Sequence, residues 1–186
     1  QSINLLFHGA LLKCKGVEVL LKAFKELQQK DKKIKLTIAG GGEEEGYLKQ
    51  IVKNQSIEGV NFTGWYDHKI LEKIMEEVDI GIVMRNGNFG NNFVVTTCLL
   101  ENWKFKVPVI VPKLKTFEMV IKDGVNGVFF EPDNVIDLSE KIIFLIKNKE
   151  RWSKMGHRGY DTAKLLFSHK KIATKMVETL VKIYEK

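Results

Sequence analysis

The stretch from Gly87 to Glu101, GNFGNNFVVTTCLLE, combines residue types that could bind a nucleotide. Glycine and asparagine tolerate left-handed backbone conformations, so its first half can fold tightly and turn N–H groups inward. The helix expected after it begins with unpaired N–H groups that attract anions, and Thr96 and Thr97 add hydroxyl donors. Glu101 lies one turn beyond Thr97 and can accept hydrogen bonds from two adjacent hydroxyls, such as a ribose diol. The alternative is a surface Glu101 paired with Lys104 at i+3.

An earlier loop could contribute to the same site. The segment His8–Gly16, HGALLKCKG, carries Lys13 and Lys15 just before a predicted helix. A lysine in that position can reach a phosphate held near helix N-termini. The alternative is that both lysines are solvated, as is common in a chain this rich in lysine.

A third loop, AGGGEEEG at Ala39–Gly46, is glycine-rich but does not match a dinucleotide-binding fingerprint. Counted from Gly40 and Gly42, that fingerprint requires glycine at the position of Glu45, and successive glutamates would repel a pyrophosphate. We interpret the loop as a tight turn between a strand and a helix. Gly41 still permits a close approach of the backbone to a ligand.

The elements that must position these loops alternate along the chain. Short apolar runs predict strands, and runs with apolar residues at helical spacing predict helices. The predicted strands are 3–8, 33–40, 60–64, 78–84, 107–112 and 126–131; the predicted helices are 16–30, 47–55, 68–77, 94–105, 117–124 and most of the chain from 135, with a break near Gly156–Gly159. This alternation predicts an α/β fold, a Rossmann-like doubly wound parallel sheet with helices on both faces, whose ligand loops share one edge.

Composition narrows the class further. The chain has 186 residues, 44% of them hydrophobic, and a formal net charge of +7 carried mainly by scattered lysines. No apolar run approaches the ~18–20 residues of a membrane span, and no aromatic-interleaved basic stripe favours nucleic acid. Cys14 and Cys98 lie far apart and belong to no metal-binding cluster, so we expect no metal and a reduced, cytoplasmic setting. The positive charge is also compatible with the inner face of an anionic membrane.

Several segments, taken in order, resemble one known family. LLFHGALLKCKGVEVLLKAFKEL, LTIAGGG, VNFTGWY, CLLENWKFKVPVIVP and EMVIKDGVNGVFFEPDN are similar to successive motifs of the family 4 glycosyltransferases. These are retaining enzymes built from two Rossmann-like domains, an arrangement called the GT-B fold. The resemblance is to their C-terminal, donor-binding domain and covers nearly the whole chain.

The resemblance implies roles for particular residues. Lys15 matches the lysine that contacts the donor diphosphate, and Glu101 matches the second glutamate of an E-x7-E motif, which binds the ribose. The segment Gly64–Tyr66 matches the residues along the base. Besides Lys15 and Glu101, which we expect to carry the catalytic roles, the predicted donor-binding residues are His8, Gly9, Ala10, Gly41, Gly64, Trp65, Tyr66, Asn92, Phe93, Thr96 and Thr97.

Two positions depart from the family pattern. Ala10 stands where the family has an arginine that pairs with the lysine on the phosphates. Phe93 stands where the first glutamate of E-x7-E, which contacts the donor sugar, should fall. Asn88, Asn91 or Asn92 could supply polar contacts to the sugar instead.

We therefore expect residues 1–186 to form a single nucleotide-sugar-binding domain with a helical tail from about 168. By the same resemblance, an N-terminal acceptor domain is absent from this chain, and the isolated domain is inactive. The implied reaction transfers a hexose from a UDP- or GDP-linked donor to a glycan or lipid-linked acceptor. Two alternatives stay open: a non-catalytic module of the same fold that binds a nucleotide or a partner, and an enzyme resembling the sugar-nucleotide epimerases.

Overall fold

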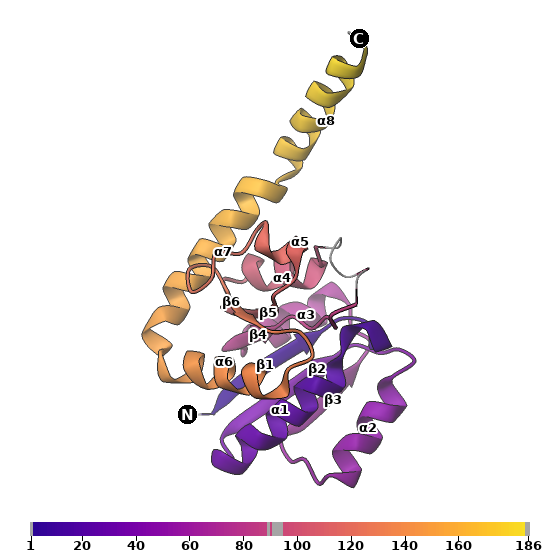
Figure 1. Cartoon of the computed structure of the whole chain (residues 1–186), viewed down its shortest axis with the longest axis vertical. Coiled ribbons are helices and arrows are strands. Elements are labelled where there is room, and N and C mark those ends of the chain that lie inside the picture. The colour runs from indigo at the N-terminus through magenta and orange to yellow at the C-terminus, as the bar shows by residue number, and fades with distance from the viewer. Residues whose placement is uncertain (1, 89, 91–94, 185–186) are drawn as a thin grey trace.

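The computed structural model describes residues 2–88, 90 and 95–184, which form a parallel β-sheet covered by helices (Figure 1). The order across the sheet is β3-β2-β1-β4-β5-β6, and every neighbouring pair is parallel. This arrangement confirms the predicted Rossmann-like doubly wound sheet. The strands are β1 (Ile3–His8), β2 (Ile34–Ala39), β3 (Val60–Gly64), β4 (Ile80–Ile82), β5 (Val109–Pro112) and β6 (Val128–Phe130).

Helices pack on both faces of the sheet. They are α1 (Val17–Lys30), α2 (Glu45–Asn54), α3 (His68–Met75), α4 (Thr97–Lys104), α5 (Lys115–Glu118), α6 (Val135–Lys147), α7 (Trp152–Phe167) and α8 (His169–Tyr184), with short 3-10 turns at η1 (Lys13–Lys15) and η3 (Lys149–Arg151). Successive strand residues point to opposite faces. Leu5 accordingly belongs to the core beneath α1, α2 and α6, whereas Leu6 packs with α3.

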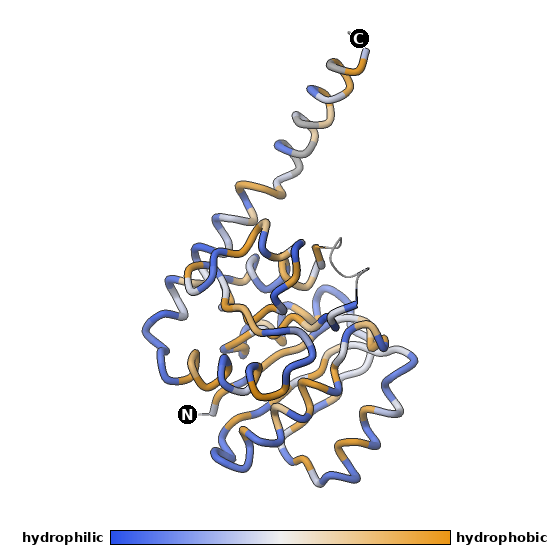
Figure 2. Tube along the Cα trace, viewed as in Figure 1, coloured by the Kyte–Doolittle hydropathy of each residue, from blue (hydrophilic) through white to orange (hydrophobic). Residues whose placement is uncertain are grey.

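Helix α1 shows how the sequence pattern builds these layers. Its apolar residues recur at helical spacing, and Val17, Leu20, Leu21, Phe24 and Leu27 are all buried. The remaining positions are largely polar, which gives the alternating colours along this helix in Figure 2. Burial of one apolar stripe therefore fixes the rotation of α1 against the sheet.

The break predicted near Gly156–Gly159 is wrong, because α7 runs continuously through both glycines. The interruptions lie at η3 and at Ser168 instead. A Cβ atom at position 156 would overlap the carbonyl of Lys106, and one at position 159 would overlap the indole ring of Trp103. These glycines are needed where α7 presses on α4 and on the residues after it, and tertiary packing overrides their poor helix propensity.

Helix α8 extends away from the sheet and its covering helices (Figure 1). Its substantial contacts are with α7. Apolar side chains on it, including Met176, Val177, Leu180 and Val181, are exposed. Within the part of the chain that the structure describes, no helix has the length and apolar character needed to cross a membrane.

Candidate functional site

Four loops follow the carboxyl ends of β1, β2, β3 and β4 and meet at one edge of the sheet, which we call the loop edge. The Leu11 N–H donates to the Gly41 carbonyl at 2.9 Å, and the Glu44 N–H donates to the Leu11 carbonyl at 3.1 Å. The Asn86 N–H donates to the Cys14 carbonyl at 3.1 Å. These bonds join the loops after β1, β2 and β4 beside the β1/β4 switch point, where doubly wound sheets bind ligands.

Glycine is required where the β2 loop crosses the β1 loop. Gly42 has a φ of +153°, and a Cβ atom there would lie 2.5 Å from the Leu11 carbonyl oxygen. The glycine run therefore serves a close backbone crossing, in agreement with its interpretation as a tight turn rather than a dinucleotide fingerprint.

The two lysines of the β1 loop differ sharply in their surroundings. Lys13 is exposed, as the alternative of a solvated surface lysine requires, whereas Lys15 is only 8% exposed at the end of η1. Burial lowers the pKa of Lys15, and the nearby positive charge of Arg85 lowers it further. Of the two, Lys15 is the lysine held inside the site.

Arg85 is a residue that the sequence analysis missed. It follows β4 at the loop edge, is partly buried, and places Nη1 3.9 Å from the sulfur of Cys14. Its charge acts on the adjacent Lys15. The signal available in the sequence was its position: Arg85 comes three residues after the last residue of β4, at the strand end that borders the switch point.

Helix α4 begins at the same edge. Thr96 is its N-cap residue and is buried, yet its side chain makes no capping hydrogen bond. Its hydroxyl oxygen has no hydrogen-bond partner among the residues that the structure describes. Buried polar groups are normally paired, so this hydroxyl at the start of α4 could accept a hydrogen bond from a ligand atom or donate one to it.

The first turn of α4 lies against the β1 loop. A Cβ atom at Gly9 would be 3.1 Å from the sulfur of Cys98. Thr97, the first residue of the helix, is exposed, and Ala10 is partly buried. The first turn of α4 and the Gly9 backbone are therefore close together.

Glu101 faces His8 at the sheet end. Its Oε2 lies 3.6 Å from His8 Nδ1, and the Tyr66 hydroxyl lies 3.2 Å from the same nitrogen. The predicted alternative, a surface pair of Glu101 with Lys104, is wrong: Lys104 points to Glu72 at 3.5 Å. Glu101 therefore lies against the end of β1, four residues after Thr97, the first residue of α4.

Asn102 and Cys98 lie against the far side of the His8 ring. The Asn102 amide nitrogen donates to the Cys98 carbonyl at 2.8 Å and lies 3.0 Å from His8 Nε2. The Cys98 backbone is also a hydrogen-bond partner of His8. On the other side of the ring, Nδ1 faces Tyr66 and Glu101.

Burial shifts the pKa values of this cluster. It lowers the pKa of His8 to about 4, so His8 is neutral near neutral pH. It raises the pKa of Glu101 and that of Tyr66. A neutral His8 therefore places a polar ring beside Glu101 without adding a second charge.

Three potential metal ligands are also close together. Ligand atoms of His8, Cys98 and Glu101 lie within 4.8 Å of one another. Both ring nitrogens of His8 already face polar partners, Asn102 on one side and Tyr66 and Glu101 on the other. The hydrogen-bond network therefore accounts for this arrangement.

An exposed aromatic residue marks the β3 side of the loop edge. Trp65 is 71% exposed, and a Cβ atom at Gly41 would lie 2.6 Å from its Nε1. The Gly40 N–H donates to the Gly64 carbonyl at 2.9 Å. Gly41 and the Gly64–Tyr66 segment are therefore neighbours. Asn92 and Phe93, predicted to face a donor sugar, lie outside the described residues.

The loop edge thus has two chemically different parts. The positive part comprises Lys15, Arg85 and the start of α4. The hydrogen-bonding part comprises Glu101, His8 and Tyr66. Such a site can hold an anion and an adjacent group bearing hydroxyls.

Known proteins share both the sequence and the fold. An uncharacterised glycosyltransferase of Methanocaldococcus jannaschii is 31% identical over 189 residues, which cover 100% of this chain and 46% of the relative. The crystal structure of Anabaena HepE in complex with UDP-glucose matches with a TM-score of 0.83 at 19% identity, over 97% of this chain and 49% of that chain.

A second solved structure is that of a mutant of S. aureus TarM in complex with fondaparinux, alpha-GlcNAc-glycerol and UDP. It matches with a TM-score of 0.84 at 19% identity, over 95% of this chain and 35% of that chain. The chain spans about half the length of the curated relatives it matches. Residues 1–162 match the model of the family described as glycosyl transferases group 1, and the chain belongs to that family.

Proposed function

We propose that the loop edge binds a nucleoside-diphosphate sugar and that this chain is the donor-binding part of a retaining hexosyltransferase. The observation that carries the proposal is the position of buried Lys15 beside Arg85 and near the start of α4, whose N-cap side chain makes no capping hydrogen bond. The positive charge of buried Lys15, beside that of Arg85, is unfavourable unless an anion accompanies it. A diphosphate supplies that anion.

The roles of the remaining site residues follow from the placement of the diphosphate beside Lys15. With the diphosphate against Lys15, Thr96 and the start of α4, the ribose diol falls to Glu101, one helical turn away. The base lies along Gly64–Tyr66, and the donor sugar faces the loop after β4. As the bond to the sugar breaks, the leaving diphosphate gains negative charge, which Lys15 and the helix start stabilise.

UDP is the donor nucleotide that we favour over GDP. Structural neighbours carry it: HepE is described with UDP-glucose, and the TarM mutant with UDP. The retaining outcome rests on the resemblance of the motifs to family 4 enzymes. The acceptor is a glycan or a lipid-linked glycan, an assignment supported by the sugar ligands in the TarM complex.

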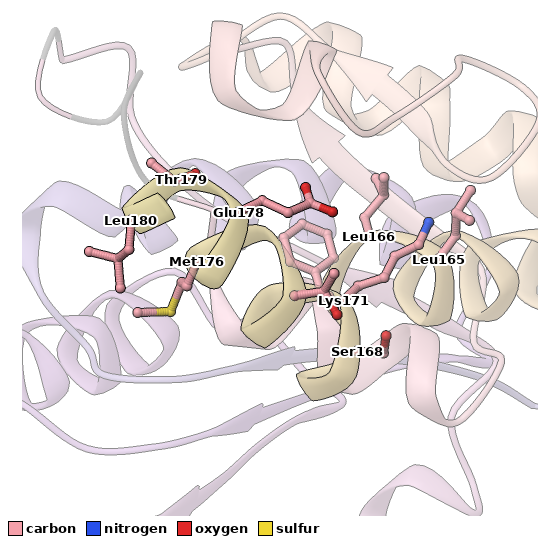
Figure 3. A pocket seen from close by; sticks show the side chains of 10 residues that line it. Leu165, Leu166, Ser168, Lys171, Met176, Glu178, Thr179 and Leu180 are labelled. Carbon is pink, nitrogen blue, oxygen red and sulfur yellow. The ribbon is translucent and has the colours of Figure 1, made fainter. Parts of the chain in front are cut away.

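We propose that a second domain binds the acceptor and covers the apolar surface of α8. A groove of about 1050 Å³ lies where α7 meets α8 (Figure 3). Its lining includes apolar Leu165, Leu166, Met176 and Leu180, together with Lys171 and Glu178. The relatives are about twice as long as this chain and so have room for such a domain. The isolated chain would then bind donor without transferring sugar.

Isothermal titration with UDP, GDP, ADP and UDP-glucose tests donor binding. We expect Lys15→Ala and Glu101→Ala each to weaken UDP binding by about tenfold or more. Lys13→Ala is the matched control, since it removes an exposed lysine of the same loop, and should bind UDP like the native chain. Absence of binding by every nucleoside diphosphate at millimolar concentration would overturn the proposal.

A non-catalytic nucleotide-binding module is the second candidate, because Ala10 removes a cation that the family pattern expects. The complete protein separates the two candidates. If the complete protein hydrolyses UDP-glucose or transfers its glucose, and Lys15→Ala abolishes that reaction, the chain is part of an enzyme. UDP binding without either reaction supports the module.

A further inference from the structure

We propose that Arg85 is the second diphosphate-binding cation of this site and supplies, from the β4 loop, the positive charge that Ala10 lacks. This inference rests on the proposed donor site. It assigns to a residue of a different loop a contact that the family motif places on the loop after β1.

The β4 loop is fixed against the turn that carries Lys15. The Asn86 N–H donates to the Cys14 carbonyl at 3.1 Å, and the Asn86 amide donates to the Lys13 carbonyl at 3.4 Å. The Arg85 guanidinium lies 3.9 Å from the Cys14 sulfur. Contacts with Lys13 and Cys14, the two residues before Lys15, therefore hold this part of the β4 loop beside it.

The next residue of the loop is anchored as well. The Gly87 N–H donates to Asp133 Oδ2 at 2.8 Å, so this carboxylate is engaged with the backbone. Among the described residues, Lys15 has no carboxylate within the 4.0 Å of an ion pair. The charge that acts most strongly on Lys15 is that of Arg85.

Two neighbouring cations without a carboxylate at Lys15 suit a ligand with two linked anionic groups. A guanidinium can donate two parallel N–H bonds to phosphate oxygens, whereas an ammonium acts as a compact point charge. A diphosphate can occupy both together. The two cations repel each other in the free protein, and the ligand removes that repulsion when it binds.

The test compares UDP with uridine, which lacks phosphates, on four forms of the full chain: native, Arg85→Gln, Arg85→Lys and Arg158→Gln. Arg158 is exposed on α7, so its replacement makes the same change in net charge away from the loop edge. Calorimetry measures UDP affinity, ligand-observed NMR measures uridine, and thermal unfolding checks the fold. A Lys15→Ala variant tests separately whether UDP binds at the proposed donor site.

We expect Arg85→Gln to weaken UDP binding by about ten- to a hundredfold relative to Arg158→Gln, with uridine binding unchanged. Arg85→Lys keeps the positive charge but cannot donate two parallel N–H bonds. It should therefore lose less affinity for UDP than Arg85→Gln does. UDP binding by Arg85→Gln within about twofold of Arg158→Gln overturns the inference. So does an equal loss for uridine and UDP, which indicates a disturbed loop.

The two proposals fail in different ways. If the native chain binds no nucleoside diphosphate, the donor site is wrong and the role of Arg85 fails with it. The other outcome is that the native chain binds UDP, Lys15→Ala loses UDP binding and Arg85→Gln keeps it. In that case only the proposed role of Arg85 is wrong.

Discussion

Glu101 and Lys15 are both held in surroundings that disfavour their charged forms. Burial raises the pKa of Glu101 and lowers that of Lys15. Burial of both groups therefore disfavours their charged forms in the folded chain. Functional sites often trade stability in this way, because the groups that bind a ligand must stay available to it.

We expect Glu101→Gln to raise the melting temperature at neutral pH, by roughly 1–3 °C, while weakening UDP binding. A raised folded-state pKa means that the folded chain holds the Glu101 proton more tightly than the unfolded chain does. The resulting stability is complete below the ordinary value of 4.5 and is lost as pH rises through the folded value. The glutamine side chain does not ionise, so the Glu101→Gln variant avoids that loss of stability.

Thermal unfolding at about pH 4 and pH 7 checks the sign of the expected change in melting temperature. The advantage of Glu101→Gln should be present at the higher pH and shrink at the lower one. A variant less stable than the native chain at neutral pH would show that contacts of the carboxylate outweigh its burial.

At the scale of elements, the strands and most helices follow from apolar spacing, but a glycine is ambiguous in sequence. Gly156 and Gly159 resemble a helix break because glycine is a poor helix former. The structure shows that they allow α7 to approach Trp103 and the Lys106 carbonyl. Trp103 is fully buried and donates its indole N–H to the Asn126 carbonyl at 3.0 Å. Spacing along one segment cannot show such a distant partner.

Gly159→Ala should destabilise the chain by about 1–3 kcal/mol, because the added methyl group overlaps the indole of Trp103. Gly46→Ala is the matched control: it is an exposed glycine inside α2 with nothing within 4 Å of the added methyl. There, better helix propensity should stabilise by about 0.5–1 kcal/mol. Urea unfolding of both variants measures the difference, and a stabilised Gly159→Ala would contradict the packing role.

At the scale of the whole molecule, topology explains why part of the site could be predicted. A doubly wound sheet brings every strand's carboxyl end to one edge, so Lys15 and Glu101 were expected together. Arg85 was not, because its role depends on how the β4 loop is held against Cys14. Loop conformations of that kind have no periodic signature in sequence.

The placement of α8 gives the last prediction, which concerns the complete protein. Ending the chain after Ser168 should leave the melting temperature of the isolated domain within about 2 °C. The physical reason is that the substantial contacts of α8 are with α7, and the buried core identified among the described residues ends at Met155.

If a second domain covers α8, the same truncation should lower both the melting temperature and the transferase activity of the full-length protein. Calorimetry on both pairs separates the possibilities: a large loss in the isolated domain would mean that α8 supports this fold directly, and no loss in either would leave α8 without a covering partner.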